Sequence, residues 1–210
     1  MKRNRFDGTV AVVHTPSVDE TRWLLEQATQ HEFIRGVVGW ADLRDPGAVL
    51  DEYQRHPTFR GVRWWCDGEL PAGLNELAPR GLTLDVAAGF TREIIDRHPE
   101  LRVVIDGVGA GQGSAPVEFA AHRNLYLKIS GLITPAPTRW KAAEFQPAVR
   151  AALAAFGADR VMYGSDWPSY LPVGTWKEAL AAFTQSIGAQ TMDTREQLLG
   201  ATAKRFYSLA

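Results

Sequence analysis

Residues 159–168 have the sequence DRVMYGSDWP, and this stretch decides the fold class because its pattern recurs along the chain. It begins with the short apolar run Val161–Tyr163, continues through Gly164, and ends with Asp166 before Trp167 and Pro168. A short run of apolar and β-branched residues is typical of a strand that is covered on both faces. Glycine and proline after such a run are typical of a tight turn. The stretch therefore predicts a buried strand whose far end carries an acidic group.

Six further runs share this pattern, and longer stretches with helical periodicity separate them. The expected strands are Thr9–Val13, Ile34–Gly39, Phe59–Trp64, Leu82–Val86, Arg102–Asp106, Leu125–Ile129 and Arg160–Tyr163. The expected helices are Val18–His31, Pro46–Arg55, Pro71–Pro79, Thr91–Arg97, Ala115–Arg123, Ala142–Phe156, Thr175–Ile187 and Asp193–Tyr207. Acidic residues in a first turn, at Asp19 and Glu20, and a glycine just after a last turn, at Gly157, support two of the expected helix ends.

Strict alternation of strands and helices predicts the α/β class, with a parallel sheet and helices outside it. Two architectures fit this alternation: a doubly wound open sheet and a (β/α) TIM-type barrel. An ordinary barrel of that type has eight βα units and about 250 residues. This chain has 210 residues and offers about seven units. We expect a single domain over residues 1–210, and a barrel of this length is expected to be incomplete or distorted.

The composition excludes several classes of protein. With 45% hydrophobic and 10% aromatic residues, the chain is neither disordered nor collagen-like. The formal net charge of −1 gives no overall field that favours nucleic acid or an anionic membrane. The single cysteine, Cys66, excludes an internal disulfide framework and favours a reducing compartment. Because the sequence has no secretory signal and no membrane-length apolar run, we expect a cytoplasmic protein with a small-molecule substrate.

Polar or aromatic side chains follow the ends of nearly all the expected strands. The carboxyl ends of parallel strands meet at one edge of a sheet or one rim of a barrel, so these side chains are expected to line a cleft. Polar residues are common in the loops of any protein, and the tryptophans could equally pack beneath the loops. No single residue of this set therefore establishes a cleft. The set comprises His14, Trp40, Asp42, Arg63, Trp64, Trp65, Asp85, Asp106, Lys128, Ser130, Asp166 and Trp167.

Three members of this set indicate particular chemistry. Asp166, at the mouth of a tight turn, is a candidate general base toward water, or alternatively a residue that caps the turn. Lys128 interrupts an apolar strand, so it needs a cleft, where it can polarise a carbonyl or bind a carboxylate, or a partner such as Asp106 or Asp85. The planar guanidinium of Arg63 suits carboxylate recognition, and a salt bridge between neighbouring strands is the alternative.

Motifs for other chemistries are absent from the sequence. It contains no His-x-His, no His-Glu-x-x-His and no clustered Cys/His spacing, so no metal site is predicted. The glycine-rich stretch 107–114 has the wrong spacing for a dinucleotide-binding loop, and we expect a flexible loop over the cleft there. No Gly-x-Ser-x-Gly elbow of a serine hydrolase is present. The sequence therefore predicts neither a metal nor an organic cofactor.

Six segments occur in a fixed order along the chain: 36–43 (GVVGWADL), 59–63 (FRGVR), 81–85 (GLTLD), 126–132 (YLKISGL), 159–168 and 203–207 (AKRFY). Together they resemble the amidohydrolase-2 family of TIM-barrel hydrolases. Within that family they are most similar to the branch of sugar lactonases and pyrone-dicarboxylate lactonases. The resemblance covers almost the whole chain from about Val10 onward, and the Gly-Ser-Asp-Trp-Pro segment is its most specific part.

The resemblance implies a distorted (β/α)8 barrel in which the aspartate of the last strand, here Asp166, activates water against a lactone carbonyl. It implies that Arg63 and Lys128 contact the substrate or its carbonyl, and that Trp40 is a wall of the pocket. The lactonase branch is often metal-independent, whereas related decarboxylases use a divalent metal. We take either His14 or Lys128 as the candidate acid or electrophile beside Asp166. The further candidate substrate-binding residues are Trp64, Asp85, Asp106, Ser130 and Trp167.

The sequence departs from the family pattern in three places. It begins where the family's second strand would begin, so the first strand and its His-x-His pair are missing. The segment Ile105–Gly109 has a glycine where the family has a histidine. The segment between Asp85 and Thr91 is shortened. His14 lies where relatives often carry glutamine, and it is either a partial replacement or a coincidence.

Three hypotheses follow. The first is a metal-independent enzyme that acts on a lactone, an ester or a ring-shaped carboxylated metabolite, by hydrolysis or by dehydration, isomerisation or cyclisation. The second is a non-catalytic pseudoenzyme or ligand-binding scaffold, and the third is a truncated lactonase whose gene starts upstream. Because a barrel without one strand has two unpaired edges, we expect the gap to be narrowed by neighbouring strands, covered by Met1–Gly8 or closed by a homodimer.

Overall fold

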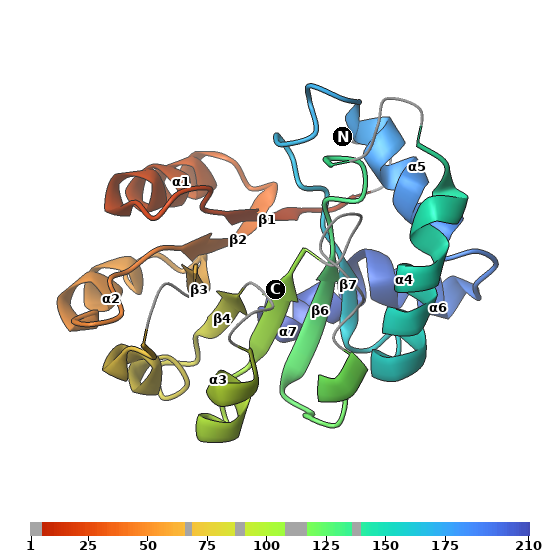
Figure 1. The fold of residues 1–210 in the computed structure, drawn as a ribbon. Coiled ribbons are helices and arrows are strands. Elements are labelled where there is room, and N and C mark those ends of the chain that lie inside the picture. The colour runs from red at the N-terminus through yellow and green to blue at the C-terminus, as the bar shows by residue number, and fades with distance from the viewer. Residues whose placement is uncertain (1–5, 66–68, 87–90, 108–116, 136–139) are drawn as a thin grey trace. The chain divides into compact units, whose positions relative to one another are not determined.

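The structure is a computed structural model, and it describes residues 6–65, 69–86, 91–107, 117–135 and 140–210. The chain divides into two compact units. Unit 1 comprises Met1–Val103 and Phe206–Ala210, and unit 2 comprises Val104–Arg205. Each unit is an α/β structure in which strands that neighbour one another in the chain are neighbours in the sheet (Figure 1).

Unit 1 alternates parallel strands with helical segments. Its strands pair in chain order, and the register of the last pair places Arg63 opposite Asp85. Helices α1 and α2 lie along the same face of these strands (Figure 1). The elements in chain order are β1 (Thr9–Val12), α1 (Val18–Gln30), β2 (Ile34–Gly39), α2 (Gly47–Tyr53), β3 (Phe59–Trp64), the 3-10 helix η2 (Ala72–Glu76), β4 (Thr83–Val86) and α3 (Thr91–Arg97).

Helix α1 shows how the sequence produces this packing. Its N-cap residue Ser17 accepts a hydrogen bond from the backbone N–H of Glu20, which satisfies one of the free N–H groups of the first turn. Thr21, Leu25 and Ala28 are spaced three to four residues apart and form its buried face. A Cβ atom on Gly39 of β2 would lie 2.2 Å from the Thr21 methyl carbon, so the glycine permits this close packing of helix on strand.

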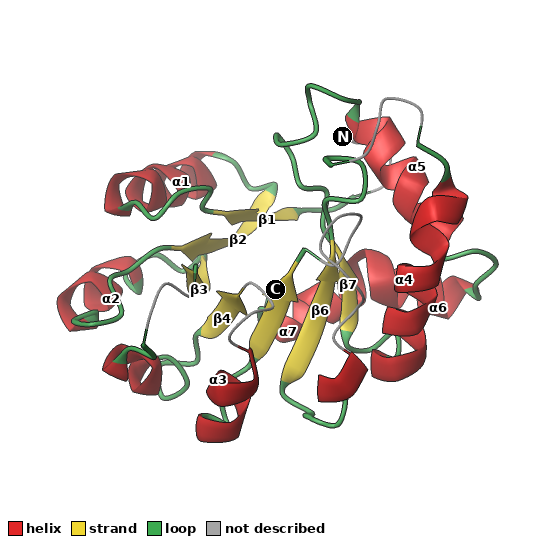
Figure 2. Cartoon of the chain, viewed as in Figure 1, coloured by secondary structure: helices red, strands yellow, loops and turns green. Residues whose placement is uncertain are grey.

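Unit 2 continues the alternation (Figure 2). Strands β6 and β7 pair in parallel, with Lys128 opposite Met162 and Ile129 opposite Tyr163. Helix α4 ends at Gly157, whose φ of 72° suits glycine, and α5 begins with a capping box between Thr175 and Glu178. The elements are β5 (Val103–Asp106), the 3-10 helix η4 (Val117–Phe119), β6 (Leu125–Ile129), α4 (Ala142–Phe156), β7 (Val161–Tyr163), α5 (Trp176–Ser186), α6 (Met192–Glu196), the π-helical segment η5 (Gln197–Ala201) and α7 (Thr202–Phe206).

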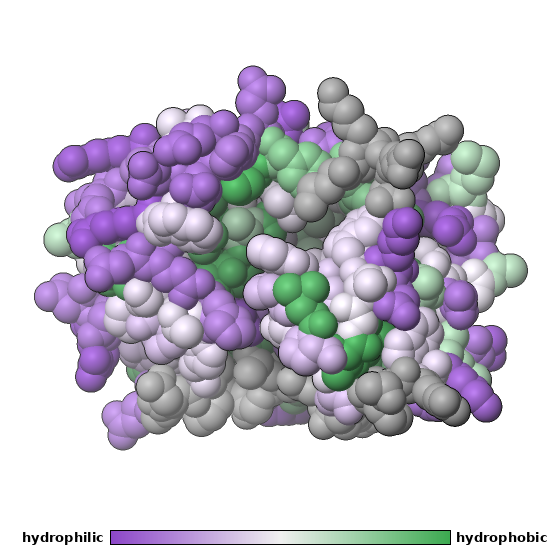
Figure 3. All heavy atoms as spheres, turned by 90° about the horizontal axis from the view of Figure 1, so that it is seen from above, coloured by the Kyte–Doolittle hydropathy of each residue, from purple (hydrophilic) through white to green (hydrophobic). Residues whose placement is uncertain are grey.

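Most strand residues are buried, as the apolar runs of the sequence predict, whereas the residues of β1 are exposed or partly exposed. In β4 every residue is buried, and in β6 all but Tyr126 are buried. Side chains of α4 and α5, among them Val149, Phe156 and Phe183, complete the core of unit 2. On the face drawn in Figure 3, hydrophobic residues show only in patches among hydrophilic ones.

The fold prediction is confirmed: the protein is α/β, of the (β/α) TIM-type barrel class, with seven strands in the described part of the chain. Every strand agrees with its expected bounds to within one residue. A single domain over residues 1–210 and a homodimer stay predictions. Residues 1–5 of the segment expected to cover the gap, and the glycine-rich stretch from residue 108 onward, lie outside the described residues.

Two of the expected helices are wrong in type. In place of Pro71–Pro79 the structure has the five-residue 3-10 helix η2, because Pro79 disfavours a helical conformation at the residue before it. In place of Ala115–Arg123 it has η4, whose surrounding hydrogen bonds run from residue i+3 to residue i. The expected helix Asp193–Tyr207 is divided by η5. None of the helices among the described residues is long and apolar enough to cross a membrane.

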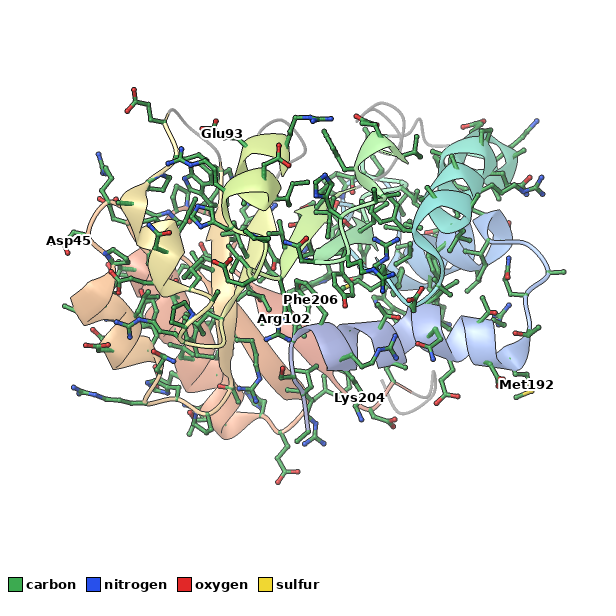
Figure 4. All side chains as sticks on the ribbon, turned by 90° about the horizontal axis from the view of Figure 1, so that it is seen from below. Asp45, Glu93, Arg102, Met192, Lys204 and Phe206 are labelled. Carbon is green, nitrogen blue, oxygen red and sulfur yellow. The ribbon has the colours of Figure 1, made fainter. Side chains whose placement is uncertain are left out.

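The C-terminal segment of unit 1 is anchored by two polar side chains. The hydroxyl of Tyr207 lies 3.1 Å and 2.9 Å from the two carboxylate oxygens of Asp85, and both residues are buried. Arg102 donates hydrogen bonds to the carbonyl oxygens of Phe206 and Gly81 and to Ser208 Oγ, and Figure 4 shows Arg102 beside Phe206. A buried carboxylate on β4 therefore depends on a residue near the end of the chain.

We predict that Tyr207→Phe lowers the free energy of unfolding by about 1–3 kcal/mol, because the buried Asp85 carboxylate loses a hydroxyl donor. Urea denaturation measures this change. Tyr170→Phe is the matched control: Tyr170 is also fully buried, and its hydroxyl has no hydrogen-bond partner in the described part of the chain. The control should change stability by less than about 0.5 kcal/mol. An equal loss in both variants would contradict the anchoring role of Tyr207.

Candidate active site

The carboxyl ends of β6 and β7 lie side by side in unit 2 and form the centre of the candidate site. The Gly164 N–H donates to the carbonyl oxygen of Ile129 at 2.9 Å. A Cβ atom on Gly164 would lie 2.8 Å from Ser130 Cβ and 3.0 Å from Lys128 Cδ. Only glycine therefore leaves room for the Lys128 side chain against the end of β7.

Lys128 forms a buried ion pair with the neighbouring strand β5. Its Nζ atom lies 3.3 Å from Asp106 Oδ1, and the two side chains are only 9% and 13% exposed. Asp106 was one of the two partners that the sequence suggested for Lys128, and the structure forms this pair within unit 2. A charged ammonium group is the form that can polarise a carbonyl.

Asp166 lies in the turn that directly follows β7. Its φ of 59° is in the left-handed region, which is uncommon for residues other than glycine but accessible to aspartate. Its carbonyl oxygen accepts a hydrogen bond from Ser169 N–H at 2.9 Å, and Trp167 N–H donates to Ser165 Oγ at 3.2 Å. These two bonds fix the tight turn that the sequence predicted at this position.

The loop after β6 contacts the Asp166 carboxylate. Thr134 Oγ1 donates a hydrogen bond to Asp166 Oδ2. Gly131, with a φ of 66°, faces the same oxygen, since a Cβ atom there would lie 3.3 Å from Oδ2. A small pocket beside this contact is lined by Gly131–Thr134, Tyr163–Ser165 and Ala179, and it has room for about one water molecule.

Two tyrosines lie in the same part of unit 2. Burial raises the pKa of Tyr163, and the charge of Tyr170 raises it further. Burial also raises the pKa of Tyr170, and the negative charge of Asp166 adds to this effect. The Tyr170 phenol is therefore close enough to Asp166 for the negative charge of that carboxylate to raise its pKa.

The predicted site residues of unit 1 have other partners. Arg63 donates to the Val13 carbonyl at 3.2 Å, and its guanidinium carbon lies 4.9 Å from the centre of the Trp65 ring. His14 is exposed, and its backbone N–H donates to Glu20 Oε1 at 2.7 Å. The Trp40 N–H donates to Thr21 Oγ1 at 2.8 Å, and the residue is partly exposed.

Several candidate substrate-binding residues differ widely in exposure. Asp85 is 0% exposed, and both of its oxygens contact the Tyr207 hydroxyl. Trp64 and Ser130 are also buried, whereas Trp167 is 64% exposed beside Asp166. The structure thus places Asp85 in the core, where it contributes to packing of the C-terminal segment. Substrate contact by these residues, and by His14, Trp40, Arg63 and Asp106, stays a prediction.

Sequence reasoning missed Thr134 and Tyr170. Thr134 lies in a loop 32 residues before Asp166, and no local pattern marks a hydrogen bond over that separation. Tyr170 follows the Trp167–Pro168 turn, and its position four residues after the predicted base was the one available signal. The complete burial of the Tyr170 side chain could not be predicted from its place in the sequence.

A family model described as amidohydrolase matches residues 1–209. The chain belongs to the amidohydrolase family. An L-fucono-1,5-lactonase of Burkholderia ambifaria is 30% identical over 243 residues, which cover 100% of this chain and 82% of that protein. These findings confirm the predicted family and its lactonase-like hydrolase character.

Solved structures confirm the fold of this amidohydrolase. An amidohydrolase from Burkholderia multivorans with bound zinc has a TM-score of 0.86 at 28% identity, and the match covers 100% of this chain and 86% of that one. The putative 2-pyrone-4,6-dicarboxylic acid hydrolase from Pseudomonas putida has a TM-score of 0.78 at 23% identity, with 99% and 84% of the two chains covered.

Because the Burkholderia multivorans structure contains bound zinc, we examined whether the described residues of this amidohydrolase could hold a metal ion. Within residues 6–65, 69–86, 91–107, 117–135 and 140–210, no group of three or more His, Cys, Asp or Glu side chains is placed to hold a metal ion. In unit 2 the Asp106 carboxylate faces the Lys128 ammonium, and Asp166 accepts from Thr134. The described residues therefore do not fit a zinc site.

We predict that Asp106 and Lys128 are energetically coupled. Asp106→Asn leaves a buried ammonium group and Lys128→Met leaves a buried carboxylate, so each single variant should lose about 3–5 kcal/mol of stability. The double variant should be about 1–3 kcal/mol more stable than the sum of the two losses predicts. Urea denaturation of the four proteins measures this coupling. Losses that add to within about 0.5 kcal/mol would show that the two groups do not stabilise each other.

Proposed function

We propose that this amidohydrolase hydrolyses a lactone without a metal ion and that Asp166 is its general base. The observation that supports this role is the hydrogen bond that holds one oxygen of the Asp166 carboxylate, because its donor, Thr134, lines a pocket with room for about one water molecule. A carboxylate within hydrogen-bond reach of a water can accept its proton as the water attacks a carbonyl carbon.

The reaction then proceeds in two balanced steps. Asp166 accepts a proton while the water oxygen forms a bond to the lactone carbonyl carbon, and the carbonyl oxygen becomes an oxyanion. The Lys128 ammonium group is the cation of this site that can stabilise the oxyanion. The bond between the former carbonyl carbon and the ring oxygen then breaks. The ring oxygen takes the proton from Asp166, and the product is an open-chain hydroxy acid.

The two carboxylates of the site have different surroundings, which supports assigning the base to Asp166. Asp106 faces a cation at 3.3 Å, and protonating it would weaken a buried ion pair. Asp166 has a neutral hydroxyl donor instead, and it is only partly buried. It can therefore change its protonation state without leaving a buried cation unpaired.

Relatives suggest the first substrates to test. Two curated relatives, from Burkholderia ambifaria and Burkholderia multivorans, are L-fucono-1,5-lactonases and are each 30% identical to this chain. We therefore propose a sugar 1,5-lactone as the substrate class, with L-fucono-1,5-lactone as the first compound.

We predict that Asp166→Asn lowers kcat for lactone hydrolysis by about 10²–10⁴-fold, because the amide cannot accept the proton of water. A pH-indicator assay that follows acid release measures kcat, and circular dichroism checks the fold. Asp193→Asn is the matched control, since Asp193 is an exposed aspartate in the first turn of α6. Turnover of Asp166→Asn close to that of the wild type would reject Asp166 as the base. A wild-type protein that hydrolyses no lactone would reject the function and favour the scaffold hypothesis.

A second prediction concerns the metal. After treatment with EDTA and desalting, kcat/KM should stay within about twofold of its starting value, and added Zn²⁺ should not raise it, because the described residues form no ligand set. Elemental analysis of the same sample reports residual metal. Loss of activity on chelation, with recovery on adding Zn²⁺, would show that the proposal of a metal-independent reaction is wrong.

A further inference from the structure

Thr134 is the residue outside the predicted set that makes the most direct contact with Asp166. We propose that it is a positioning residue that assigns the two oxygens of the Asp166 carboxylate to different tasks. Oδ2 accepts the hydrogen bond of Thr134 and fixes the carboxylate, and Oδ1 is left to take the proton from water. This inference rests on the proposed function of Asp166 as a base.

The first observation is that the two oxygens of Asp166 have unequal surroundings. Oδ2 accepts from Thr134 Oγ1 and faces the Cα of Gly131. No hydrogen bond to Oδ1 is formed within the described part of the chain. A carboxylate fixed through one oxygen presents the other in one orientation, which is the geometry that a general base needs.

The second observation is that both sides of this contact are fixed by the backbone. On the side of Asp166, the left-handed conformation and the hydrogen bond from Ser169 N–H hold the turn. On the side of Thr134, the loop begins at Gly131, directly after the end of β6. That strand end is aligned with β7 through the hydrogen bond from Gly164 N–H to Ile129. The hydrogen bond from Thr134 to Asp166 therefore connects the loops that follow β6 and β7, two strands that already pair with each other.

The third observation is that the Thr134 hydroxyl is not used for a local structural purpose. Two other threonines of unit 2 bond the backbone: Thr184 donates to the carbonyl of Leu180, and Thr202 donates to that of Ala158. The hydroxyl of Thr134 instead donates to a carboxylate 32 residues away in the chain, and the residue also lines the water-sized pocket. One side chain therefore contacts both the proposed base and a pocket that has room for a water molecule.

This placement has a kinetic consequence that distinguishes it from a packing role. A hydroxyl that orients the base acts on the geometry of the reacting groups, so its removal should lower kcat with little change in KM. Loss of packing alone would lower the free energy of unfolding without this separation of kcat from KM.

The test compares Thr134→Val, which removes the hydroxyl at nearly constant shape, with Thr134→Ser, which keeps it. In Thr134→Val we expect kcat to fall about tenfold, with a much smaller change in KM. Thr134→Ser should restore both quantities to near the wild-type values. Thr184→Val, the same change within α5, should alter neither. Thr134→Ala provides the same comparison if the valine variant does not fold.

A measurement that needs no activity accompanies the kinetics. Urea denaturation of Thr134→Val and Thr134→Ser reports how far each change lowers the free energy of unfolding. A fall in kcat that Thr134→Ser reverses, with equal stability of the two variants, supports the positioning role. An unchanged kcat in Thr134→Val, in a series where Asp166→Asn is inactive, would overturn the role of Thr134 and leave the base assignment standing. Full activity of Asp166→Asn would instead overturn the proposed function and this role with it.

Discussion

The close contact between β6 and β7 at Gly164 is the constraint on which the candidate site depends. A side chain at residue 164 would meet Ser130 Cβ at 2.8 Å and Lys128 Cδ at 3.0 Å. Without that glycine Lys128 would have to leave its position near Asp106, and β6 would move away from β7. The turn that holds Asp166 begins two residues later, so its position relative to the loop after β6 follows from the same contact. One residue without a side chain thus sets the spacing of both charged groups.

The conformations of the two loop residues at this edge complete the arrangement. Asp166 and Gly131 both have φ values in the left-handed region, 59° and 66°. For glycine this conformation has little steric cost, whereas for aspartate it is uncommon and persists only when neighbouring contacts favour it. The hydrogen bonds from Ser169 and Thr134 are such contacts. The strained residue is also the one with the proposed catalytic role, as is often found in active sites.

The strands could be predicted from the sequence because each is a short apolar run between glycine, proline or charged residues, a local pattern. Helix types were predicted less well where only a few residues separate two prolines, as in η2. The Lys128–Asp106 pair was among the predicted alternatives, since a lysine in an apolar strand requires a partner. The contacts of Thr134 with Asp166 and of Tyr207 with Asp85 could not be predicted. They join residues 32 and 122 positions apart, and nothing local marks them.

The two carboxylates of the candidate site illustrate how neighbouring groups, rather than residue type, distinguish a structural acid from the proposed base. Asp106 balances a buried cation, so proton uptake there would cost the energy of an ion pair. Asp166 is oriented by an uncharged hydroxyl, which restrains its geometry while leaving its charge uncompensated by any cation among its described contacts. A base must change its protonation state in every turnover. Of the two, Asp166 is the one that can do so without disrupting the buried ion pair of Asp106 with Lys128.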